Sequence, residues 1–64
     1  MKYIILKLYD NIVVIADYHK KRFEITFKNG ELSDICIYGH IPFDSVVNTY
    51  KNAGFKQIKK FTAR

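Results

Sequence analysis

The dipeptide Asn29-Gly30 is the feature that most constrains how this chain folds. It separates residues 22–28 (RFEITFK), which alternate between polar and apolar side chains, from the strand-like residues 31–38 (ELSDICIY). Alternation with a period of two is typical of a half-buried strand. Asn-Gly supplies the positive φ angles of a type I′ turn, the tightest link between antiparallel strands. The sequence therefore predicts a hairpin over residues 22–38. We expect three side chains of its first strand to point inward and four outward, namely Phe23, Ile25 and Phe27 against Arg22, Glu24, Thr26 and Lys28.

The pairing of this hairpin predicts a β-bulge in its second strand. A two-residue turn pairs Phe27 with Leu32, but a regular ladder would then set Ile25 opposite Asp34. A shift of one residue moves side chains to the opposite face of a sheet. One extra residue near Ser33 and Asp34 would bring the apolar residues of both strands together. The residues matched in this way are Ile35 with Ile25, and Ile37 with Phe23.

Two further strands are expected before this hairpin. Residues 2–9 (KYIILKLY) alternate with apolar side chains on both faces, and residues 12–18 (IVVIADY) are rich in β-branched side chains. Asp10-Asn11 between them is suited to a tight turn. His19-Lys20-Lys21 then makes a polar connection to the second hairpin. The first half of the chain therefore reads as four consecutive antiparallel strands.

From Pro42 the hydrophobic period changes to that of a helix. Apolar side chains recur at i, i+3, i+4 and i+7, namely at Phe43, Val46, Val47 and Tyr50. Pro42 suits the first helical position, and Gly54 suits the left-handed residue that ends a helix. In that ending Phe55 should contact Tyr50. We expect a helix over residues 42–53, followed by a return strand over about 55–61, with a helical tail as the alternative.

The expected fold is therefore α+β, a single domain over residues 1–64. Its order is ββββαβ, with four to five strands in a small antiparallel sheet and one short helix packed on one face. A 64-residue chain buries only about 60% of the surface that its unfolded form exposes, so its core is thin. Cys36 is the single cysteine and excludes an intramolecular disulfide. Self-association into a homodimer is then one way to gain stability.

One helix covers one face of such a sheet and leaves the other face for water or a partner. Three arrangements are open: the sheet closes into a small barrel, two chains pack their faces together, or the face is a platform on which tyrosine rings stack on nucleic-acid bases. The candidate interaction face from the first two strands is Tyr3, Ile5, Tyr9, Ile12, Val14 and Tyr18.

The C-terminal segment carries the whole net charge of +5. Residues 51–64 hold five basic and no acidic side chains, whereas residues 1–50 sum to zero. Basic residues interleaved with aromatic ones are expected where cations meet phosphates and rings meet bases. The alternatives are a charge kept for solubility and edge protection, or an acidic protein partner. The candidate nucleic-acid-binding residues are Lys51, Lys56, Lys59, Lys60, Arg64, Phe55 and Phe61, joined by Lys20, Lys21 and Arg22.

No catalytic or metal-binding pattern stands out in the sequence. Cys36, His19 and His40 fit no zinc spacing, and the glycines are isolated rather than grouped in a phosphate loop. We expect neither an enzyme nor a bound metal or cofactor. No run of apolar residues reaches the length of a membrane span, and no signal peptide is evident, so we expect a cytoplasmic protein that does not enter a membrane.

Together these patterns favour a small basic, non-enzymatic binding module that self-associates and holds nucleic acid. Nine of the eleven basic residues are Lys, and bidentate base recognition prefers Arg, so we expect little sequence preference. The alternative is a protein–protein interaction or inhibitor module that docks a partner through the tyrosine-rich sheet face.

Overall fold

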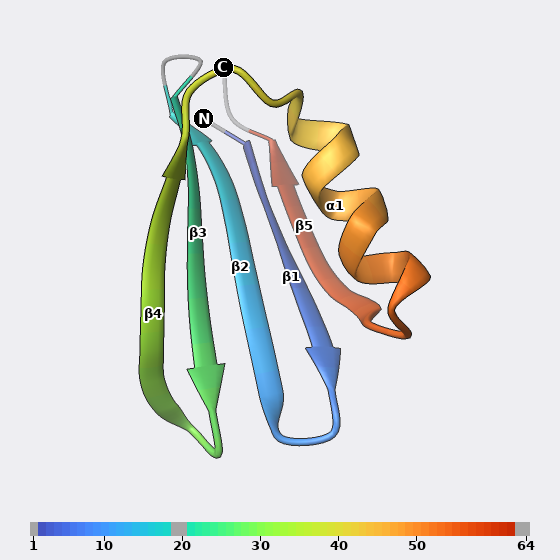
Figure 1. Ribbon diagram of the computed structural model, residues 1–64. Coiled ribbons are helices and arrows are strands. Elements are labelled where there is room, and N and C mark those ends of the chain that lie inside the picture. The colour runs from blue at the N-terminus through green and yellow to red at the C-terminus, as the bar shows by residue number, and fades with distance from the viewer. Residues whose placement is uncertain (1, 19–20, 63–64) are drawn as a thin grey trace.

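A computed structural model describes residues 2–18 and 21–62 of the chain, which form a five-stranded antiparallel sheet and one helix (Figure 1). The strands lie in the spatial order β4-β3-β2-β1-β5. This confirms the α+β class and the ββββαβ order, and it shows that the C-terminal segment is a strand rather than a helical tail. The elements are β1 (Lys2–Leu8), β2 (Asn11–Tyr18), β3 (Lys21–Lys28), β4 (Glu31–Tyr38), α1 (Phe43–Asn52) and β5 (Lys56–Thr62).

The sheet is open, because β4 and β5 are its two edges. The suggestion that it closes into a small barrel is therefore wrong for the described strands. Closure would require these two strands to pair, but they lie at opposite edges of the sheet and are not paired (Figure 1). Three strands lie between them, and the connection through α1 crosses from one edge to the other.

The β3–β4 hairpin has the predicted turn and the predicted bulge. Asn29 has φ 55° and Gly30 has φ 82°, both in the positive range that a type I′ turn needs. Phe27 pairs with Leu32, and Thr26 pairs with Asp34, which leaves Ser33 as the extra residue. Beyond the bulge the two strands are matched as expected, with Ile35 beside Ile25 and Ile37 beside Phe23.

The β1–β2 turn lies one residue earlier than predicted. Leu8 pairs with Asn11, so the turn residues are Tyr9 and Asp10 rather than Asp10 and Asn11. Tyr9 takes φ 55°, a left-handed conformation that is uncommon for a residue other than glycine. The continuous pairing of β1 with β2 fixes this position, and the local preference of Asn for turns is overridden.

Helix α1 packs over the neighbouring strands β1 and β2. A helix about 10 Å across covers roughly two strands that lie about 4.8 Å apart. The core between helix and sheet is correspondingly small, and the rest of the sheet is left without a covering layer. Its buried apolar residues are Ile4, Leu6, Val13, Ile15, Phe43, Val46 and Val47.

Both ends of α1 show defined backbone geometry. Pro42 has φ −56° and ψ 141°, an extended conformation, so it precedes the helix and is not its first helical residue as predicted. At the other end Gly54 has φ 106°, and the Phe55 N–H donates to the Tyr50 carbonyl oxygen at 3.1 Å. The two aromatic rings meet edge to face, with centroids 5.2 Å apart. This is the predicted helix ending.

The two faces of β3 are the reverse of the expectation. Directly paired residues in antiparallel strands share a face, and Glu24 pairs with the buried Ile15 under the helix. Phe23, Ile25 and Phe27 therefore lie on the face away from α1. The register with β2 decides this arrangement, and the more apolar side of β3 is not the side under the helix. Helix α1 itself is too short and too polar to cross a membrane, and it is the one helix in the described ranges.

Candidate functional site

The face of the sheet opposite α1 has no covering layer, and we call it the open face. Strand pairing places its residues in three rows that run across the sheet. Phe61 pairs with Tyr3 through its backbone, but its side chain lies outside the described part of the structure. From β1 towards β4, the first row is Tyr3, Ala16, Phe23 and Ile37. The second row is Ile5, Val14, Ile25 and Ile35, and β5 adds Lys59 to it. The third row is Lys7, Ile12, Phe27 and Leu32, and β5 adds Lys56 to it.

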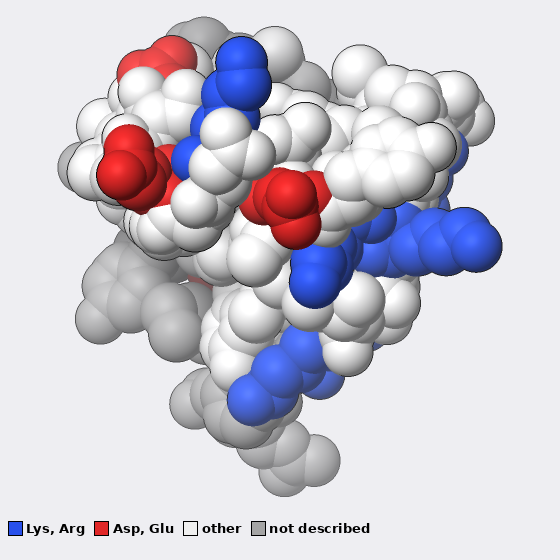
Figure 2. All heavy atoms as spheres, turned by 90° about the horizontal axis from the view of Figure 1, so that it is seen from below, with Lys and Arg blue, Asp and Glu red and all other residues white. Residues whose placement is uncertain are grey.

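Charges on the open face are all of one sign among the described side chains. Lys7, Lys56 and Lys59 are exposed and lie together where β1 meets β5. No carboxylate occupies a described position in the three rows, because the acidic residues of the strands share the helix side of the sheet. These are Asp17, Glu24, Glu31 and Asp34. Figure 2 shows the end with the hairpin turns, where basic side chains predominate to the right and below and acidic ones to the left and in the centre, with a basic side chain between them.

The β4 side of the open face is apolar and strongly exposed. Leu32 is 58%, Ile35 is 54% and Ile37 is 66% accessible to solvent. The apolar residues of β1, β2 and β3 in the same rows are half-buried where the structure describes them. An apolar surface that continues over several strands is typical of an interaction site.

The structure brings together some of the predicted nucleic-acid-binding lysines and separates others. Lys56 and Lys59 lie on the open face, whereas Lys60 pairs with Ile4 and is placed on the helix side. Lys51 lies in the last turn of α1. Lys7 was missed, although the alternation of residues 2–9 already puts it on the same face as Tyr3 and Ile5.

Five other predicted binding residues are placed elsewhere or are not fully described. Arg22 lies on the helix side of β3, where its Nη1 donates to the Gly39 carbonyl oxygen at 3.2 Å, and β1 and β2 separate it from β5. Phe55 is half-buried against Tyr50 and packs with the core on the helix side, not with Lys56 and Lys59 on the open face. Lys20 and Arg64 lie outside the described residues, and for Lys21 only the backbone is described.

The predicted interaction face is largely placed on the open face. Tyr3, Ile5, Ile12 and Val14 all belong to its rows. Tyr9 does not, because it lies in the β1–β2 turn and is 85% exposed. The side chain of Tyr18 lies outside the described part. Sequence reasoning missed the β3 and β4 residues of this face because it turned β3 the wrong way.

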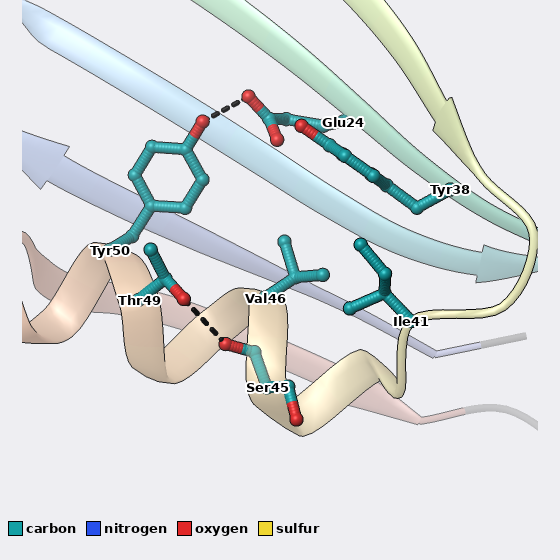
Figure 3. A pocket seen from close by; sticks show the side chains of 7 residues that line it. All are labelled: Glu24, Tyr38, Ile41, Ser45, Val46, Thr49 and Tyr50. Carbon is teal, nitrogen blue, oxygen red and sulfur yellow. Dashed lines mark hydrogen bonds between the residues drawn. The ribbon is translucent and has the colours of Figure 1, made fainter.

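A second polar feature lies on the helix side, where Glu24 is only 5% exposed. The hydroxyl of Tyr50 donates a hydrogen bond to its carboxylate (Figure 3). The Tyr38 hydroxyl also bonds to this carboxylate. The bond to Glu24, together with partial burial, raises the pKa of Tyr38 to about 12. Burial and the bond to Glu24 also raise the pKa of Tyr50. Both phenols therefore remain neutral hydrogen-bond donors at neutral pH.

Glu24 forms part of the wall of a pocket of about 240 Å³ between α1, the end of β4 and the connection that follows β4 (Figure 3). The Thr49 hydroxyl donates to the Ser45 carbonyl oxygen at 2.9 Å along one side. Ile41 and Val46 give the pocket apolar walls, and the two tyrosine rings complete it. We call this the Glu24 pocket; it is lined by Glu24, Tyr38, Ile41, Ser45, Val46, Thr49 and Tyr50.

No metal cluster is found in residues 2–18 and 21–62, and the Cys36 thiol is not activated. No group of three or more His, Cys, Asp or Glu side chains in these ranges is placed to hold a metal ion. Desolvation and the neighbouring Asp34 carboxylate, to which the thiol donates at 3.6 Å, raise the pKa of Cys36. The thiol is thus protonated at neutral pH. No protein-family model, curated protein or solved structure matches this chain.

Proposed function

We propose that this chain is a small basic, non-enzymatic binding module that holds single-stranded nucleic acid across its open face with little sequence preference. The observation that supports it best is the composition of that face: aromatic and aliphatic rows, three lysines at one corner, and no carboxylate at the described positions. The proposal includes a cytoplasmic setting, because a single cysteine provides no intramolecular disulfide.

The rows provide surfaces for stacking. Tyr3 and Phe23 stand in one row, and the small side chain of Ala16 lies between them. Neighbouring strands are about 4.8 Å apart, so the two rings are roughly two strand spacings from each other. Single-strand binders stack bases on such rings, and each stacked base contributes about 1–3 kcal/mol to binding.

The lysines provide the contact with the backbone of the nucleic acid. Lys7, Lys56 and Lys59 are long, exposed and free to follow phosphates beside the aromatic row. A lysine ammonium acts as a point charge and reads no base edge, which accounts for the expected lack of sequence preference.

The test compares two triple variants with the same change in net charge. The first changes Lys7, Lys56 and Lys59 to Gln, and the second changes Lys28, Lys51 and Lys60, which lie away from the open face. Fluorescence anisotropy of short labelled oligo-U and oligo-dT is measured over a range of salt concentrations. For single strands log K falls with log salt by about 0.7 per phosphate contact, so the open-face triple should reduce that slope by about 2.

The second triple should keep most of the slope and the affinity. Equal losses in both triples would show that net charge, and not the open face, is responsible. If the unchanged chain binds neither oligonucleotide at low salt, the nucleic-acid proposal is wrong.

The β4 side of the open face favours a second function, contact with protein. Three residues on this side are exposed: Leu32, Ile35 and Ile37. Their direct partners on β3 are apolar, and no lysine lies next to them on the open face of β3 or β4. An uncharged apolar strip can pack against a second copy of this chain without bringing its positive charges together. A homodimer formed in this way leaves the β1–β5 corner accessible. Docking of a different, acidic protein is the alternative, with the lysines steering it.

A further inference from the structure

We propose that the Glu24 pocket binds a small primary alkylammonium ion, with the Glu24 carboxylate as its counter-charge and the walls of the pocket around its carbon chain. This site is on the opposite side of the sheet from the open face and is independent of nucleic-acid binding. Three properties of the pocket support this assignment: the hydrogen-bonding groups that remain available, the charge, and the size.

The hydrogen-bonding groups that remain available are mainly acceptors. Both phenol hydrogens, of Tyr38 and Tyr50, are engaged with the Glu24 carboxylate. The Thr49 hydroxyl hydrogen is engaged with the Ser45 carbonyl oxygen. What these groups still offer is lone pairs, because a hydroxyl has two acceptor sites besides its one hydrogen. A complementary ligand must therefore bring donors, and an ammonium group has three donors and no acceptor.

The charge of the pocket also points to a cation. Glu24 is only 5% exposed, and none of the residues that line the pocket is Lys or Arg. A buried carboxylate is costly unless it is paired, and the two phenols bond to it without neutralising it. The faces of tyrosine rings attract an ammonium group within about 6 Å of the ring centre. A cation in the pocket would thus meet one full charge and two aromatic rings.

The size and the remaining walls select a short aliphatic chain. The pocket volume of about 240 Å³ lies below the roughly 300–1,000 Å³ of sites that hold drug-sized ligands. Such a space suits a ligand with a few carbon atoms, well below the size of a nucleotide. Ile41 and Val46 provide hydrocarbon surface away from the carboxylate. An alkylammonium ion can place its charged group at Glu24 and its chain against these two residues.

The experiment is a titration followed by ¹H–¹⁵N NMR on the full chain, with n-butylammonium chloride as the probe. Sodium chloride at equal ionic strength and 1-butanol, which has the same chain without the charge, are the comparison ligands. We expect saturable shifts at the amides of Glu24, Tyr38 and Val46 with the ammonium probe and weaker, non-saturating shifts with 1-butanol. The variant Glu24→Gln should weaken binding about tenfold or more, as expected when a charged hydrogen-bond partner is lost.

The matched control is Glu31→Gln, which removes an exposed carboxylate from β4 and should leave the affinity within about twofold, as surface charges contribute little. Ile41→Trp fills the pocket from an exposed position without removing the carboxylate, and it should abolish binding. That variant decides the question if Glu24→Gln does not fold. Equal affinity for 1-butanol and n-butylammonium, unchanged binding in Ile41→Trp, or no saturable shift at all would overturn the proposal.

Discussion

The phenol of Tyr38 links the stability of this chain to alkaline pH. Its hydrogen bond to the buried Glu24 carboxylate raises its pKa to about 12 in the folded chain, against about 10 for an unperturbed tyrosine. The folded chain therefore holds this proton at a pH where the unfolded chain has released it. By linkage the contribution is complete below about pH 10 and is lost as the pH rises through about 12.

We predict that Tyr38→Phe makes the free energy of unfolding less dependent on pH between about 10 and 12. The wild-type chain should lose stability steeply over this range, and the variant should lose less, because the raised pKa is gone. Urea unfolding at several pH values, followed by circular dichroism, measures the difference. Tyr9→Phe is the matched control, since Tyr9 is 85% exposed and lies in a turn. The same pH dependence in Tyr38→Phe and the wild type would contradict the prediction.

At the scale of the elements, the turn after α1 directs the chain from the helix into β5. Gly54 at φ 106° allows Gly54 N–H to bond to the Lys51 carbonyl oxygen and Phe55 N–H to bond to that of Tyr50, both at 3.1 Å. The ring of Phe55 then closes against Tyr50, which itself holds Glu24. One backbone conformation thus connects the helix ending, the core and the start of the edge strand.

Gly54→Ala should lower the free energy of unfolding by about 1–2 kcal/mol, the cost of left-handed backbone for a residue with a Cβ. The nearest atom to the new Cβ would be Leu8 Cδ1 at 3.8 Å, an ordinary contact, so the backbone and not a clash causes the loss. Gly39→Ala is the control, because Gly39 has no positive φ and no neighbour within 4 Å of a Cβ. It should be neutral or slightly stabilising. Chemical denaturation distinguishes the two, and equal effects would contradict the prediction.

Most elements follow from local sequence patterns, and the arrangement of their faces does not. Asn29-Gly30, the misfit of Ile25 with Asp34 and the Tyr50–Phe55 pair each specify a turn, a bulge or a helix ending within a few residues. The orientation of β3 depends on which neighbours lie under a helix that is far away in the sequence. Phe23, Ile25 and Phe27 form the most apolar side of β3. The helix packs on β1 and β2, and the register of β3 with β2 places these three residues on the opposite face of the sheet.

The candidate sites were predicted only in part for the same reason. The lysines of the open face could be predicted only with the pairing of β5 with β1, which places Lys56 beside Lys7 and Lys60 on the helix side. The Glu24 pocket forms where Glu24 of β3, Tyr38 of β4 and Tyr50 of α1 meet, and no spacing of residues along the chain predicts this meeting. A glutamate in an alternating strand is usually exposed, and it is buried here because two phenols satisfy it.

At the scale of the whole molecule, the sheet separates two environments. The helix side holds the core, the acidic residues of the strands and the Glu24 pocket. The other side holds apolar rows and lysines. A thin core over two strands leaves much apolar surface outside it, so association of two copies would stabilise the chain by mass action.

We predict that the weight-average mass rises with protein concentration in sedimentation equilibrium, and that Ile35→Lys combined with Ile37→Lys abolishes this rise. Two charges placed on the exposed β4 strip would repel those of a second copy. Asn48→Lys combined with Asn52→Lys adds the same charge to exposed positions of α1 and should keep the association. A monomer at all concentrations in the wild type, or equal loss in both double variants, would contradict this.

The pairing of β1 with β5 also affects how the protein forms during synthesis. β1 precedes β5 in the chain by all the other elements, yet β5 is the strand that pairs with its outer edge, from Lys2 opposite Thr62 to Lys7 opposite Lys56. As long as β5 has not been synthesised, β1 is an edge strand with a row of unsatisfied peptide groups that another chain could pair with. The docking of β5 covers that row, so it is a step at which the growing sheet gains protection from aggregation.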